Sequence, residues 1–380
     1  MNRQINALRG VSFFYYATQA ILLPLLPLYF NHKGYNAAQI GTLMMIGPLV
    51  AVLAQPVWGY FSDRYSLKKT IRSLWILTIA CSVGLFVTEG YGPAFTFVLL
   101  LYFFMLPWNP LLDSLLYQSA TRFGRSYGSI RLWGSLGFFV TAIITGALLP
   151  YLGGVPNIKW MYWTLGVMPL VLLIFVQDEK PAGGKQVTLQ AMLALLSNRR
   201  LLWFLVLVFL LTVPHRMNDA LFGLHMLDLG ASAGTVSAAW AVAACSEMLG
   251  FALIGRWAAK YNELALLGLA ACMYTLRWAA YALTDSPSLL LLFQASHSVT
   301  FAVFWIVSVQ YVVRMVPPEL RSTGQSLLSA VFLGLAGIAG GSLGGWMKEM
   351  WGGGGMYWMG AGFTLLAAVL FFVTQALQRK

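Results

Sequence analysis

The chain has 380 residues, of which 59% are hydrophobic and only 9% are charged, and its mean hydropathy is +0.72. Roughly a quarter of the residues of a soluble domain are charged, so this composition excludes a soluble globular protein. It predicts an integral membrane protein whose apolar surface faces lipid.

Twelve apolar stretches are each long enough for a membrane-spanning helix of about 20 residues. Long apolar runs without alternation favour helices over a β-barrel, so we expect an all-α membrane protein. In chain order the stretches are 8–30, 38–61, 71–88, 93–118, 128–150, 159–177, 200–226, 233–257, 263–283, 287–313, 323–346 and 354–376.

A polar segment at 178–199 separates the sixth stretch from the seventh. It predicts a cytoplasmic linker between a six-helix bundle at 1–177 and another at 200–380. Two matches at one common offset support duplicated halves: "GYFSDRY" at 59–65 with "GRWAAKY" at 255–261, and "SYG" at 126–128 with "STG" at 322–324. Duplicated halves are typical of secondary transporters.

The formal net charge of +12 reflects an uneven distribution of basic residues along the chain. With both termini inside, 19 of the 24 basic residues fall on the inner side, and the outer loops hold only Lys33, Lys159 and Lys348. This bias predicts a multi-pass protein of the bacterial cytoplasmic membrane with both termini cytoplasmic. Anionic lipid at the inner face is the expected partner of this charge, rather than nucleic acid. We expect a monomer.

Several ionisable side chains lie well inside the predicted helices, where each charge costs about 2.5–3.5 kcal/mol and usually marks a transport pathway. They are Asp113, Arg216, Asp219, Glu247 and Arg277, joined by His215, His225 and His297. An ion pair that only fastens helices is the alternative. We favour it for Arg216 and Asp219, which are three residues apart on one helix. No nucleophile–base or metal-binding constellation is present, so we expect no enzyme, cofactor or metal.

The segment "GYFSDRYSLKKTIR" follows the second stretch and resembles the signature of the major facilitator superfamily. Gly59, Asp63, Arg64, Lys68 and Lys69 match that signature, whereas Ser66 and Leu67 depart from it. The resemblance implies a major facilitator fold with twelve transmembrane helices in two pseudo-symmetric halves. It also implies that the matching residues form a conformational latch at the inner face.

Five further motifs occur in the same order as in the phenylpropionate permease family, which is related to lactose permease and other oligosaccharide–proton symporters. They are "PLLDSLLYQ", "YGSIRLWGSLGF", "SEMLGFAL", "LRW" and "QASHSVTF". By this resemblance Asp113 and Arg131 are a substrate-binding pair, and Glu247, Arg277 and His297 serve recognition and proton coupling.

Three positions depart from lactose permease. Thr300 replaces a proton-carrying carboxylate, Gln294 replaces a lysine, and Phe138 replaces a stacking tryptophan. Proton coupling is therefore expected to rely on Glu247 with help from Asp219. Other side chains expected to bind substrate are Phe138, Asn109, Tyr16, Gln19 and His215.

The resulting hypothesis is a secondary active transporter that takes up a small organic solute with protons by alternating access. The solute is expected to be an aromatic acid or an oligosaccharide. A drug–proton antiporter of the same superfamily is one alternative, but stretch 8–30 lacks the carboxylate that would favour it. A non-transporting membrane receptor or sensor is another, and it would need a larger soluble domain.

Overall fold

The computed structural model describes residues 2–178, 195, 197–258, 260–317 and 320–378. These residues form helices and connecting turns, and none of them lies in a β-strand. Nine helical segments within the described ranges are long and apolar enough to cross a membrane. Helix occupies each of the twelve predicted ranges, although twelve separate membrane crossings stay a prediction.

Contacts within the chain define two compact units. The first unit comprises Met1–Tyr35, Ile46–Gly184 and Ser232–Ala241, and the second comprises Asn36–Met45, Lys185–Ala231 and Val242–Lys380. The predicted linker at 178–199 lies mostly outside the described residues, so that boundary stays a prediction.

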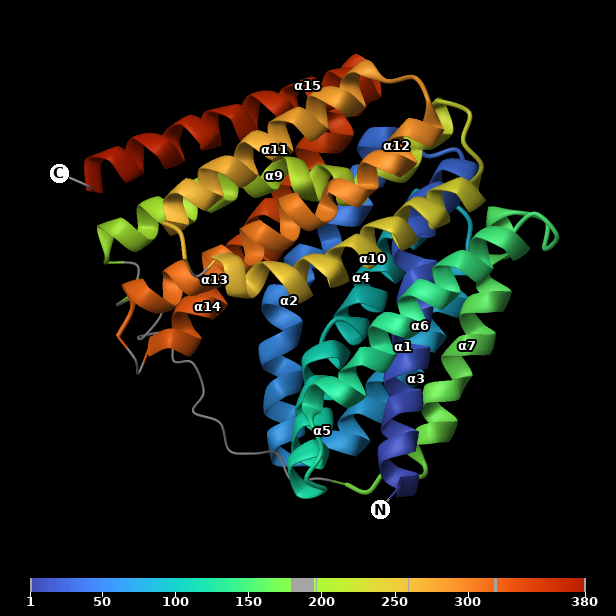
Figure 1. The fold of residues 1–380 in the computed structure, drawn as a ribbon. Helices are drawn as coiled ribbons and strands as arrows, with labels where there is room; N and C mark the ends of the chain where they lie inside the picture. Colours follow the sequence, from blue (N-terminus) through green and yellow to red (C-terminus); the bar gives the residue numbers. More distant parts are fainter. Residues whose placement is uncertain (1, 179–194, 196, 259, 318–319, 379–380) are drawn as a thin grey trace. The chain divides into compact units, whose positions relative to one another are not determined.

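In the first unit, α1 packs along α6 and α7 (Figure 1). The helices of this part of the chain are α1 (Asn2–His32), α2 (Ala37–Arg64), α3 (Leu67–Val87), α4 (Tyr91–Met105), α5 (Trp108–Arg122), α6 (Tyr127–Leu148), η1 (Val155–Asn157) and α7 (Ile158–Leu173). Trp75 and Trp108 are fully buried, and their indole N–H groups each donate to a backbone carbonyl at 2.7 Å. Their polar atoms are thus satisfied inside an apolar core.

In the second unit, α15 lies beside α9 and α11 (Figure 1). The elements of the chain from residue 199 onward are α9 (Arg199–Asp228), α10 (Ala233–Ala258), α11 (Glu263–Leu283), α12 (Pro287–Phe293), η2 (Gln294–Ser296), η3 (Ser298–Ala302), α13 (Val303–Met315), α14 (Arg321–Ser329), η5 (Ala330–Leu335) and α15 (Ala336–Gln378). The part of α10 up to Ala241 belongs to the first unit. Lys348, which was expected in an outer loop, lies within α15, where it is buried and paired with Asp228.

Several predicted helices are interrupted. The range 93–118 is divided between α4 and α5 at Leu106 and Pro107. By contrast, the break within α15 at Gly352, which has a φ of 69° and a ψ of 179°, falls between the predicted ranges 323–346 and 354–376 and so agrees with the sequence. The ranges 287–313 and 323–346 contain the π-helical turns η3 and η5. π-Helical turns often occur at functional sites, and η3 begins directly after His297.

Ser66, one departure from the family signature, forms the N-cap of α3. Its hydroxyl accepts a hydrogen bond from the backbone N–H of Lys69 at 3.1 Å. Asp178 accepts from the Ser66 hydroxyl and, at 3.2 Å, from the backbone N–H of Lys68. An acidic group at a helix N-terminus is stabilising, so the segment that begins α3 is a well-capped part of the first unit.

Candidate functional site

The first unit contains a polar cluster formed by Tyr16, Asn109, Asp113 and Arg131, here called the Arg131 cluster. Asn109 and Asp113 are four residues apart on α5 and therefore share one helix face. Nε of Arg131 on α6 lies 3.3 Å from Oδ1 of Asp113. The Tyr16 hydroxyl on α1 accepts from Arg131 Nη2 at 2.6 Å and donates to Oδ1 of Asn109 at 2.5 Å. Three helices thus bring four predicted residues together.

The Arg131 cluster retains capacity to bind a ligand. The side chain of Arg131 is 28% exposed and that of Asp113 is 36% exposed. Oδ1 of Asp113 makes no hydrogen bond of good geometry within the described part of the chain. The guanidinium carbon of Arg131 lies 4.0 Å from the centre of the Tyr16 ring. This cation–π contact orients the guanidinium. The cluster therefore offers a forked donor and an acceptor side by side, which suits a hydroxyl or a carboxylate.

Gly134 makes this arrangement possible, although no signal in the sequence distinguishes it from the other glycines of the chain. A side-chain carbon there would lie 2.5 Å from Cδ2 of Tyr16, 2.8 Å from the Ser12 hydroxyl and 2.9 Å from Arg131 Nη1. Because Gly134 follows Arg131 by one helical turn, its lack of a side chain lets Tyr16 lie against the guanidinium. Tyr127, the first residue of α6, was also missed, and it lies near enough to Asp113 to interact with that carboxylate.

Two other predicted substrate contacts lie on the same elements. Gln19 is one turn beyond Tyr16 on α1, is only 6% exposed, and its amide nitrogen has no partner among the described residues. Phe138 is two turns beyond Arg131 on α6 and packs against Ala20 and Ala142. Their contact with substrate stays a prediction.

In the second unit, Arg277 on α11 is the centre of a buried network. It is 4% exposed. Nε and Nη2 donate to the Tyr281 hydroxyl at 3.2 and 3.1 Å, and Nη2 also donates to Oε1 of Gln294. Nη1 lies 3.2 Å from Nδ1 of His297 and donates to the Thr300 hydroxyl at 3.1 Å. A guanidinium has five N–H donors, and all five are engaged here, so Arg277 serves to hold its neighbours.

These contacts determine the tautomer of His297. Arg277 can only donate, so Nδ1 of His297 must accept and Nε2 must carry the proton. Nε2 lies 3.5 Å from Oε2 of Glu247 on α10, whose side chain is 33% exposed. Three of the four residues predicted for proton coupling are therefore brought together in the order Arg277, His297, Glu247. Gln294 and Thr300, two positions that depart from lactose permease, provide uncharged hydrogen-bond acceptors for Arg277.

His215, predicted to contact substrate, lies in this second network. Its ring stacks on His297 with 5.4 Å between centroids. Nδ1 of His215 is 3.1 Å from the Tyr274 hydroxyl, and Nε2 is 3.6 Å from Oδ2 of Asp219. Arg216 donates to the same oxygen at 2.6 Å, so Arg216 and Asp219 do form the expected intrahelical pair. Pro214 lies in α9 beside these residues.

The predicted latch residues lie at the end of α2 and the start of α3. Gly59 has open space where a side chain would extend. Arg64 donates to the hydroxyl of Tyr60 at 3.2 Å and is exposed. The side chain of Asp63 is outside the described part of the structure, and the latch stays a prediction.

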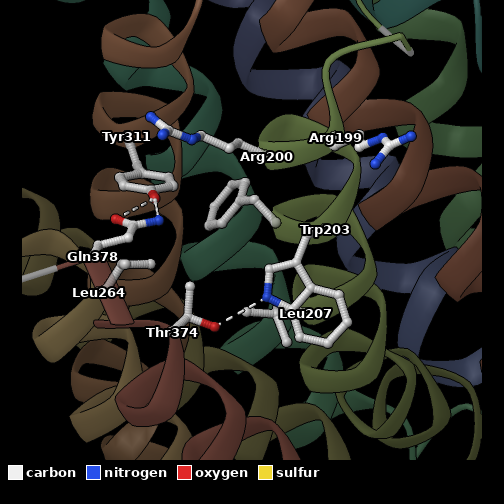
Figure 2. A pocket seen from close by; sticks show the side chains of 9 residues that line it. Arg199, Arg200, Trp203, Leu207, Leu264, Tyr311, Thr374 and Gln378 are labelled. Carbon is white, nitrogen blue, oxygen red and sulfur yellow. Dashed lines mark hydrogen bonds between the residues drawn. The ribbon is translucent and has the colours of Figure 1, made fainter. Parts of the chain in front are cut away.

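A separate cavity of about 170 Å³ lies between the beginning of α9 and the end of α15. Figure 2 shows the Trp203 indole donating to the Thr374 hydroxyl, at 3.0 Å, and Tyr311 beside Gln378. None of the predicted site residues lines this cavity. Arg199 and Arg200 belong instead to the basic residues expected at the inner membrane face.

Comparison with known proteins gives consistent results. The family model described as "MFS_1 like family" matches residues 5–359. The maltose permease of Geobacillus stearothermophilus is 29% identical over 340 residues, which cover 88% of this chain and 86% of that protein. The probable 3-phenylpropionic acid transporter of Escherichia coli (strain K12) is 26% identical over 328 residues, which cover 85% of each. The crystal structure of the nucleoside transporter NupG superposes with a TM-score of 0.87 at 20% identity and covers 98% of this chain and 99% of that chain.

Proposed function

The chain belongs to the MFS_1 like family, and from this premise we propose that it takes up a small organic solute together with protons. The major facilitator fold predicted from the sequence is confirmed by the likeness to NupG. The full-length relatives are permeases and transporters rather than enzymes. The chain is accordingly a secondary transporter of the major facilitator type, and its substrate and its coupling ion are the matters proposed here.

The proposed solute is an aromatic acid or an oligosaccharide. The observation that carries this proposal is the partly open ion pair of Asp113 and Arg131, bridged by Tyr16 to Asn109. Sugar hydroxyls and a carboxylate both suit this combination of a forked donor and neighbouring acceptors. Two relatives are named for maltose and for 3-phenylpropionic acid, and these names cover the same two classes.

The proposed coupling group is Glu247, positioned through His297 by Arg277. Glu247 is partly exposed, and Oε2 of its carboxylate lies 3.5 Å from Nε2 of His297. Because Arg277 contacts His297 rather than Glu247, the carboxylate is not held in an ion pair with this arginine. Protonation of Glu247 would weaken its attraction to His297 and link the proton to a change of conformation.

Proton movement in proteoliposomes tests the proposal. The purified protein is challenged with 3-phenylpropionate, maltose, lactose and a nucleoside while the external pH is recorded. We expect alkalinisation outside with one solute and its loss in Glu247→Gln. Glu89→Gln is the matched control, because Glu89 is exposed between α3 and α4 and lies in neither cluster.

The other outcomes separate the alternatives. Solute entry without proton movement would leave a uniporter and reject the coupling role of Glu247. No response to any of the four solutes, together with extrusion of a cationic dye under an imposed proton gradient, would favour a drug–proton antiporter.

A further inference from the structure

We propose that Arg216, Asp219 and His215 form a second proton-binding site, in which binding of a small carboxylate by Arg216 draws a proton onto His215. These three residues of α9 are called the α9 triad below. The inference rests on the proposed function and adds to it an anion subsite with its own proton.

The two stacked imidazoles of the second unit differ in their freedom to take a proton. Nδ1 of His297 lies 3.2 Å from Nη1 of Arg277. The nitrogen of the arginine can only donate a hydrogen bond. A proton added to Nδ1 of His297 would meet an N–H group and a positive charge. Nδ1 of His297 is therefore occupied as an acceptor as long as Arg277 keeps its place.

His215 has acceptors available on both sides. Nε2 faces the carboxylate of Asp219 and so carries a proton in the neutral ring, while Nδ1 accepts from the Tyr274 hydroxyl. A hydroxyl can also accept. When a hydronium ion from the medium gives a proton to the Nδ1 lone pair, its O–H bond breaks, a water molecule is left and an N–H bond forms. The Tyr274 hydroxyl then turns to accept from that N–H group. Both N–H groups of the imidazolium then face oxygen atoms.

Asp219 determines when this protonation is favourable. His215 is only 3% exposed, and a buried cation requires a counter-charge. In the structure, Oδ2 of Asp219 lies nearer to Arg216, at 2.6 Å, than to His215, at 3.6 Å. The carboxylate thus balances Arg216, and His215 has no counter-ion of its own.

Arg216 is the member of the triad that is suited to an anionic ligand. Its side chain is 24% exposed, while its Nε is buried and has no hydrogen-bond partner among the described residues. A guanidinium with an unused donor edge binds a carboxylate through paired hydrogen bonds. An anion bound to Arg216 would balance its positive charge. The carboxylate of Asp219 could then balance a protonated His215.

This exchange keeps the site electrically balanced. Before binding, Arg216 is matched by Asp219. After binding, the negative charge of the ligand balances Arg216, and the carboxylate of Asp219 balances the imidazolium of His215. The remaining charged groups near His215 are Arg277 on α11 and Glu247 on α10, both of which reach it through His297. The rings of Phe301 and Phe332, which are uncharged, also lie against the imidazole of His215.

Proton uptake on ligand binding tests the inference without any need for transport. 3-Phenylpropionate is added to purified protein in weakly buffered detergent at neutral pH, with a pH-sensitive dye, and its binding is measured by calorimetry. For the unaltered protein we expect about one proton taken up per anion bound. We expect His215→Gln to bind the anion with little proton uptake, and Arg216→Gln to lose at least about tenfold in affinity.

Glu89→Gln is the matched control, because Glu89 is exposed between α3 and α4 and lies in neither group of charged residues. We expect it to retain both the binding of 3-phenylpropionate and the proton uptake that this anion induces. Proton uptake that persists in full in His215→Gln, as it would if Glu247 alone took the proton, would overturn the inference.

Nitrogen-15 NMR of the unaltered protein provides a measurement that does not depend on a variant. The chain has four histidines. We expect one imidazole signal, assigned by its absence in His215→Gln, to move to the imidazolium position on addition of the anion. No such movement with the anion bound would contradict the inference. Transport of maltose without any binding of 3-phenylpropionate would reject this inference alone, whereas transport of no solute would reject the proposed function as well.

Discussion

A single hydroxyl holds the Arg131 cluster together. Tyr16 links Arg131 to Asn109 through hydrogen bonds of 2.6 and 2.5 Å. We predict that Tyr16→Phe weakens substrate binding roughly tenfold or more, because a hydrogen bond to a charged group contributes about 1.5–3 kcal/mol. The thermal midpoint should change little, since the ring keeps its contact with the guanidinium. Equilibrium binding of the transported solute measures the effect.

The control is Tyr29→Phe, because the Tyr29 hydroxyl makes only a long bond of 3.4 Å to the backbone of Phe86 and is remote in sequence from the cluster. Unchanged affinity in Tyr16→Phe would show that this hydroxyl does not orient Arg131 for the substrate.

Arg277 uses all five of its donors, which makes it poorly replaceable even by lysine. An ammonium group has three donors at one point and cannot reproduce a planar fork. We predict that Arg277→Lys lowers proton-driven uptake about tenfold or more while solute exchange between the two sides persists. The reason is that His297 loses the contact that determines its tautomer. Arg314→Lys is the matched control, since Arg314 is mostly exposed and pairs with Glu263.

An equal loss of exchange and of proton-driven uptake in Arg277→Lys would assign the residue to substrate binding instead.

The sequence singled out Asp113, Glu247 and Arg277 because a charge inside an apolar helix is conspicuous, whereas Arg131 was assigned through the family resemblance. It did not predict Tyr274 or Gly134, since tyrosine and glycine are common in membrane helices and only the packing of α11 and α6 gives these two a role. The assignment of His215 to the substrate stays a prediction. Its stacking on His297 is a contact between distant segments that helical periodicity does not reveal.

Among the elements, the contact between α1 and α6 depends on glycine. A side-chain carbon at Gly137 would overlap the backbone of Phe13 on α1. Backbone cannot move aside as a side chain can, and overpacking costs about 1–3 kcal/mol. We predict that Gly137→Ala lowers the thermal midpoint of the purified protein by several degrees. A thermal melt in detergent with a thiol-reactive dye measures this change.

The matched control is Gly362→Ala on α15, where no atom lies within 4 Å of the added carbon. There the substitution should be neutral or stabilising by about 0.5–1 kcal/mol, because alanine restricts the unfolded chain. Equal midpoints for the two variants would mean that close approach of α1 and α6 does not limit stability.

Hydropathy predicted where helices occur but not where they are interrupted. The turn at Leu106 and Pro107 and the π-helical turns η3 and η5 lie inside ranges that are apolar enough to read as continuous, whereas the break at Gly352 falls between the predicted ranges 323–346 and 354–376. Proline marks only the first of the unpredicted interruptions. A π-helical turn has no distinct residue preference. The interruptions arise from tertiary packing, which a one-dimensional pattern does not contain.

At the scale of the whole molecule, the distribution of basic residues predicts the orientation in the membrane. Lysine and arginine are retained on the cytoplasmic side during insertion, and nearly all of them fall on the side expected to be inner. This predicts that the turn after α1 is outside and the turn after α5 is inside. His32 and Arg125 are exposed members of these two turns, so each is a suitable position for a single cysteine.

The chain has three cysteines, and a background with all three replaced by serine gives a clean reporter. In intact cells, a membrane-impermeant maleimide should label His32→Cys and leave Arg125→Cys unlabelled, while both should react after permeabilisation. The opposite pattern would invert the topology. It would also place the basic residues beside the outer leaflet, where the anionic lipid of the inner face could not balance them. Labelling therefore decides both the orientation and the reason for the net charge of +12.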